Sequence, residues 1–156
     1  MAGTKRKSAR SSAPRKHLTK DALLPMTTAN ARKLSLTHHL ALAACRSDRG
    51  DSRLVNELAR AVYTTYFLQR AGFGDAPFEL YEHAEAAIEH ALSVAAKTGA
   101  WRIAEADAPS IEKLLALHDE QLLSVPLHRV NAAEAELRRF VAGKAPSPLV
   151  RPSQQN

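Results

Sequence analysis

The chain contains seven histidines, and histidine is the side chain that most often binds a metal ion in proteins. A di-iron site in a helical bundle needs Glu-x-x-His motifs on two helices, and zinc proteases need His-Glu-x-x-His. The sequence contains neither pattern. His38 and His39 are adjacent, so one helix cannot direct both rings toward the same ion. The spacing of the histidines therefore predicts no metal site and no cofactor.

The sequence also offers no complete pattern for a catalytic nucleophile. Residues 110–113 (Ser-Ile-Glu-Lys) and 97–99 (Lys-Thr-Gly) match two β-lactamase motifs, but in reversed order and without the third motif. No glycine-rich phosphate loop is present. Cys45 is the single cysteine, and its alanine neighbours predict a thiol that packs without reacting. We expect a protein with no catalytic residues and no small-molecule substrate, and therefore not an enzyme.

Basic residues are concentrated at the N-terminus. Seven of them, and no acidic residue, occupy the first 20 positions: Lys5, Arg6, Lys7, Arg10, Arg15, Lys16 and Lys20. The other 136 residues hold 15 of the 22 basic residues and all 16 acidic ones, so they are nearly neutral. A cationic segment of this kind attracts phosphate-rich polymers. The charge distribution predicts non-specific nucleic-acid contact by these seven side chains, and a tail that only aids solubility is the alternative.

The composition at each end predicts a disordered segment. Residues 1–24 combine the cations with glycine, serine and proline, and residues 144–156 contain three prolines. Such segments bury too little apolar surface to offset the entropy lost on ordering. We therefore expect a disordered basic arm at 1–24, a helical domain at 25–143 and a short disordered tail at 144–156.

The segment between these ends has the spacing of an all-α bundle of about five helices. Residues 52–70 show the pattern best, with apolar side chains every three or four positions. The other helices are predicted at about 28–47, from Asp75-Ala76-Pro77 to Gly99, from Asp107-Ala108-Pro109 through 122, and from 127 to Gly143, with the two Asp-Ala-Pro triplets acting as caps. No segment alternates with the period of two that strands require.

Six of the eight aromatic residues fall within 19 positions around the bend between the second and third predicted helices. They are Tyr63, Tyr66, Phe67, Phe73, Phe78 and Tyr81. One interpretation is a local core where two helices meet. The other is a surface for self-association or for a protein partner, because aromatic side chains are enriched at the centres of interfaces.

The hydropathy pattern predicts no membrane segment. The longest uninterrupted apolar stretch, residues 40–45, is far shorter than the roughly 18 residues needed to span a bilayer. The charged N-terminus is not followed by the apolar run of a secretory signal. We expect a soluble, cytoplasmic protein.

Residues 34–40 (Leu-Ser-Leu-Thr-His-His-Leu) and 54–63 (Leu-Val-Asn-Glu-Leu-Ala-Arg-Ala-Val-Tyr) resemble small bacterial proteins labelled Fis-family transcriptional regulators. The resemblance covers about a quarter of the chain. It implies DNA binding through a C-terminal helix-turn-helix, whose nearest counterpart here includes Arg129, Arg138 and Arg139.

Charge and resemblance together predict a non-enzymatic helical protein that associates with nucleic acid through its basic arm. Its role would be that of a transcriptional regulator or a DNA-associated accessory factor. The alternative is a helical module for protein–protein interaction or self-association that uses the aromatic cluster at 63–81.

Overall fold

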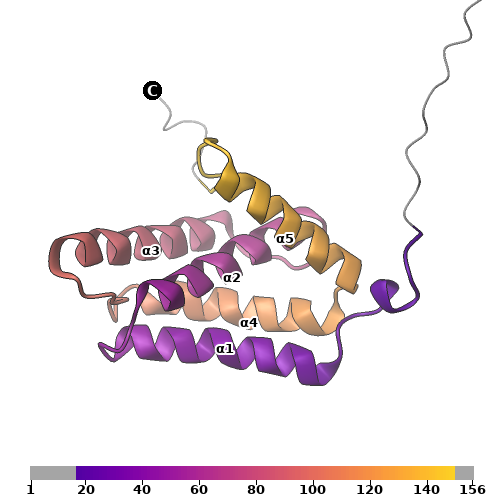
Figure 1. The fold of residues 1–156 in the computed structure, drawn as a ribbon, viewed down its shortest axis with the longest axis horizontal. Helices are drawn as coiled ribbons and strands as arrows, with labels where there is room; N and C mark the ends of the chain where they lie inside the picture. Colours follow the sequence, from indigo (N-terminus) through magenta and orange to yellow (C-terminus); the bar gives the residue numbers. More distant parts are fainter. Residues whose placement is uncertain (1–16, 150–156) are drawn as a thin grey trace, which may run out of the picture.

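The computed structural model describes residues 17–149, and these residues form a helical bundle (Figure 1). The elements in chain order are the 3₁₀ turn η1 (Asp21–Leu23) and the helices α1 (Thr28–Arg46), α2 (Ser52–Arg70), α3 (Phe78–Thr98), α4 (Ala108–Ser124) and α5 (Leu127–Ala142). Over the described residues the only β-type pairing is one isolated bridge between Pro25 and Pro126. The predicted all-α class and the number of helices are confirmed.

Helices α1, α2 and α4 pack against one another, and α3 lies against α2 and α4. Helix α5 crosses α2 and contacts η1 near its own first turn (Figure 1). The apolar faces meet in a main core between α1, α2, α3 and α4, which includes Leu58, Tyr81, Ile111 and Leu114. A second core lies under α5 and includes Leu68, Leu122, Val130 and Leu137. Helix α5 is therefore held to the bundle by its own apolar stripe.

Local capping explains some of the helix ends. Oδ1 of Asp51 accepts the backbone N–H of Leu54 over 2.8 Å at the start of α2, and Gly99 ends α3 with a φ of 76°, which favours glycine. Of the two predicted Asp-Ala-Pro caps, the one at Asp75 was wrong, whereas Asp107 does occupy the N-cap position of α4, with Pro109 in the first turn. Helix α3 begins after Pro77, and Asp107 precedes α4 in a helical conformation without a side-chain cap.

Both ends of the described chain pack onto the bundle. Residues 20–24, which fall in the predicted arm, form η1 and its flanks against the start of α5. Residues 144–149, which fall in the predicted tail, return to α2 and α3, and Leu149 is fully buried in the main core. Leu149 is a single leucine among prolines and belongs to no helical pattern, so the composition of this segment predicted a disordered tail.

Candidate nucleic-acid interface

The structure shows where the predicted arm joins the bundle. Six of its seven cations lie outside the described residues: Lys5, Arg6, Lys7, Arg10, Arg15 and Lys16. The seventh, Lys20, is exposed at the N-cap of η1. Lys20 is therefore the cation of the predicted arm whose position the structure gives.

Residues 17–24, here called the arm root, attach to the first turn of α5. The backbone N–H of Leu127 donates to the carbonyl oxygen of Leu24 over 2.8 Å. The ring of His128 donates through Nδ1 to the carbonyl oxygen of Ala22, also over 2.8 Å, because a carbonyl can only accept. Leu24 remains 52% exposed. Backbone polar contacts, rather than burial of side chains, hold the arm root in place.

Helix α5, which begins beside the arm root, carries three exposed cations. They are Arg129, Arg138 and Arg139, and the small side chains of Ala132 and Ala142 on the same helix are also exposed. Within the described part of the chain, no carboxylate lies at ion-pair distance from Arg129 or Arg139. Small neighbours leave room for a phosphate backbone to approach such guanidinium groups.

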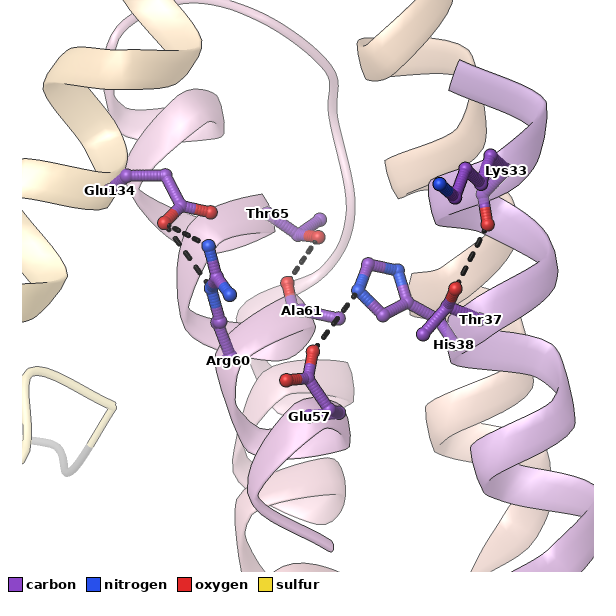
Figure 2. A network of polar contacts seen from close by, with 8 residues as sticks. All are labelled: Lys33, Thr37, His38, Glu57, Arg60, Ala61, Thr65 and Glu134. Atoms are coloured by element: carbon purple, nitrogen blue, oxygen red, sulfur yellow. Dashed lines mark hydrogen bonds and ion pairs between the residues drawn. The ribbon is translucent and has the colours of Figure 1, made fainter. Parts of the chain in front are cut away.

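The two glutamates of α5 are paired with arginines of α2. The carboxylate of Glu134 accepts from Nη2 of Arg60 over 2.6 Å and from Nε over 3.2 Å (Figure 2). Nη1 of Arg70 lies 3.3 Å from Oε1 of Glu136. The hydrogen bond that Arg60 donates to Glu134 raises the pKa of Arg60, which stays charged. Sequence reasoning did not find this pairing, because 66 to 74 residues separate the partners and no local pattern marks them.

The six aromatic residues predicted as a core or an interface pack largely inward. Phe67 and Tyr81 are buried, and the other four are half-buried. The ring of Tyr66 lies 5.4 Å from Tyr81, 5.7 Å from Phe67 and 6.3 Å from Phe78 between centroids, in tilted or edge-on arrangements. Tyr63 instead meets Phe140 of α5 at 5.2 Å. The cluster thus links α2 to α3 and to α5.

Two histidines lie in the interior between α1 and α4. The ring centroids of His38 and His118 are 5.3 Å apart, and Nε2 of His38 lies 4.0 Å from Oε2 of Glu57 (Figure 2). Burial lowers the pKa of His118 to about 4. Burial also lowers the pKa of His38, while Glu57 opposes this shift. Both rings are therefore neutral at pH 7 and form part of the core.

No group of three or more His, Cys, Asp or Glu side chains in residues 17–149 could hold a metal ion. No helix in the same range has both the length and the apolar composition needed to cross a bilayer.

Comparison with known proteins found no family model, no curated protein and no solved structure that matches this chain.

Proposed function

We propose that the chain is a non-enzymatic helical protein that associates with nucleic acid through its basic N-terminal arm, as a transcriptional regulator or a DNA-associated accessory factor in the bacterial cytoplasm. The observation that carries this proposal is the presence of seven basic residues and no acidic residue among the first 20. A cation that contacts a phosphate releases condensed counterions, so binding is favoured without any reading of bases.

The surroundings of the arm root support the same proposal. The arm joins the bundle beside the first turn of α5, whose exposed arginines are Arg129, Arg138 and Arg139. The glutamates of α5 pair with Arg60 and Arg70, so they add little repulsion toward a phosphate. A polyanion that contacts the arm meets further cations on the adjoining helix.

The test compares the full chain with a variant that lacks residues 1–16, measured by fluorescence anisotropy on duplex DNA over a salt series. This deletion removes six cations and keeps the arm root that contacts α5. For the full chain, we plot the logarithm of the DNA affinity against the logarithm of the salt concentration. The contribution of the arm to the slope of this plot should be no steeper than about −6. The deletion should remove most of the binding and most of that slope, while circular dichroism keeps the helical signal.

A matched variant that replaces Arg129, Arg138 and Arg139 with glutamine distinguishes the contribution of α5 to binding from that of the arm. It should weaken binding less than the deletion does, because it removes three cations instead of six. If the chain without its arm binds as tightly as the full chain, the arm is not the binding element. If neither chain binds at low salt, the nucleic-acid proposal fails.

The alternative function, a protein-interaction or self-association module, has one specific observation in its favour. Two of the six aromatic residues, Tyr63 and Tyr66, form hydrogen bonds with Ser147 and Pro148. The residues that connect this segment to α5, 143–146, are all exposed.

A further inference from the structure

Residues 144–149, here called the strap, follow α5 and fold back over α2 and α3 (Figure 1). The side chain of Leu149 has no exposed surface and belongs to the main core. Tyr63 and Tyr66 are half-buried and pack against the same core. The strap thus ends in a leucine that is inserted into the bundle from outside the five helices.

Polar groups of α2 and α3 bind the three residues at the end of the strap. The hydroxyl of Ser147 donates to the carboxylate of Glu85, which is only 7% exposed. The hydroxyl of Tyr63 donates to the same carboxylate oxygen and lies 3.5 Å from the Ser147 hydroxyl. Tyr66 donates to the carbonyl oxygen of Pro148 over 3.3 Å. The bundle therefore contacts a hydroxyl, a carbonyl and a leucine side chain at three separate points.

Within the strap, the Ser147 hydroxyl acts both as a hydrogen-bond donor and as an acceptor. The backbone N–H of Leu149 donates to the Ser147 hydroxyl over 3.0 Å. The Ser147 hydroxyl thus accepts one hydrogen bond and donates another. Pro148, which lies between Ser147 and Leu149, has no backbone N–H that would need an acceptor. The sequence Ser-Pro-Leu matches the groups that α2 and α3 present.

The connection between the strap and α5 is exposed. Gly143, Lys144, Ala145 and Pro146 are all exposed, and α5 ends at Ala142 before them. The strap can therefore leave its position without unfolding α5. Its departure would leave the buried Glu85 carboxylate with one donor fewer and would uncover an apolar pocket, and both changes are unfavourable unless an equivalent segment replaces it.

We propose that the surface of α2 and α3 around Glu85, Tyr63 and Tyr66 is a peptide-binding site that is filled by the chain's own Ser147-Pro148-Leu149 and that accepts the same residues from a second copy. The second copy is the occupant that matches the site at every contact, because its strap carries the identical hydroxyl, carbonyl and leucine. Exchange of identical segments between copies is a general route to dimers. This site is independent of the basic arm.

The test uses a fluorescein-labelled hexapeptide with the sequence of residues 144–149 and full-length chains. A chain with Leu149→Ser has a weakened strap, so it should bind the peptide at least about tenfold more tightly than the unaltered chain does. A peptide with serine in place of the leucine should bind this variant at least about tenfold less tightly than the original peptide. The matched control, Lys144→Ala, changes an exposed strap residue and should behave like the unaltered chain.

A milder variant and a second measurement cover the case in which Leu149→Ser does not fold. Ser147→Ala keeps the buried leucine and should also bind the peptide more tightly than the unaltered chain. In the unaltered chain, millimolar peptide should displace the strap and accelerate hydrogen exchange at the Leu149 amide, whereas the serine-substituted peptide should not. The proposal is overturned if folded variants bind both peptides equally or bind neither. It is also overturned if neither variant folds and exchange at Leu149 is unchanged.

Discussion

The two ends of the described chain pack onto the bundle by opposite means. The arm root is held by backbone groups, with the carbonyl oxygens of Ala22 and Leu24 accepting from α5 while Leu24 stays exposed. The strap is held by side chains, with Leu149 fully buried and the Ser147 hydroxyl on a buried carboxylate. An end held by backbone contacts tolerates almost any sequence and suits the attachment of an arm. An end held by specific side chains depends on the identity of its residues.

The largest effect expected from this difference comes from truncating one leucine at each end. Leu149→Ala leaves a cavity in the main core and should lower the free energy of unfolding by about 2–5 kcal/mol. Leu24→Ala changes a half-exposed side chain and should lower it by less than about 0.5 kcal/mol. Urea unfolding followed by circular dichroism measures both. Equal losses would show that the two ends are held alike.

Acid should destabilise the interior of the bundle, where His38 and His118 are buried. The folded pKa of His118 is about 4 against 6.5 for the free side chain, so the unfolded chain binds more protons as pH falls below 6.5. The stability is therefore complete above pH 6.5 and decreases toward pH 4, by about 3 kcal/mol from this residue. Burial of His38 acts in the same direction.

Urea unfolding at pH 7.5 and pH 4.5 measures this loss. The chain without residues 1–16 should show the same loss, because His38 and His118 lie within α1 and α4. The exposed His83 offers a control, and His83→Ala should leave the pH profile unaltered. A stability that does not change over this interval would contradict the assignment of His118 as a buried, neutral ring.

The smallest effect is expected at the arm root. His128→Ala removes the hydrogen bond to the carbonyl oxygen of Ala22, at a local cost of about 1 kcal/mol. Trypsin should then cleave after Lys20 about fivefold faster, while the midpoint of global unfolding stays unchanged. The neighbouring Arg129→Ala changes an exposed side chain of the same helix and serves as the control. A lower unfolding midpoint in His128→Ala would show that the arm root contributes to global stability.

The helices could be predicted from sequence because their signals are local. The range predicted for the second helix, 52–70, coincides with α2, since an apolar period, an aspartate cap and a following glycine all lie within a few residues. The strap could not be predicted in this way. Ser147 and Glu85 are 62 residues apart, and their contact depends on how α5 returns the chain.

The candidate interface was predictable only in part, for the same reason. The cations of the arm are visible in the composition of the first 20 residues. The pairing of Glu134 with Arg60, and of Glu136 with Arg70, depends on the crossing of α5 over α2. The sequence of α5 on its own shows three arginines and two glutamates, including Glu134 and Arg138 at i,i+4 spacing, and it does not show the partners that both glutamates have on α2.

The attachment of the arm root beside α5 has a consequence for the kinetics of the proposed binding. If the proposed binding occurs, the charge of the arm should steer the encounter with a polyanion, so the arm should set the rate of association and the sensitivity of that rate to salt. The arginines of α5 should follow within the same complex, because His128 holds the arm root at the first turn of that helix. They should then act on the residence time, so that shortening the arm should slow association while substituting these arginines should speed dissociation.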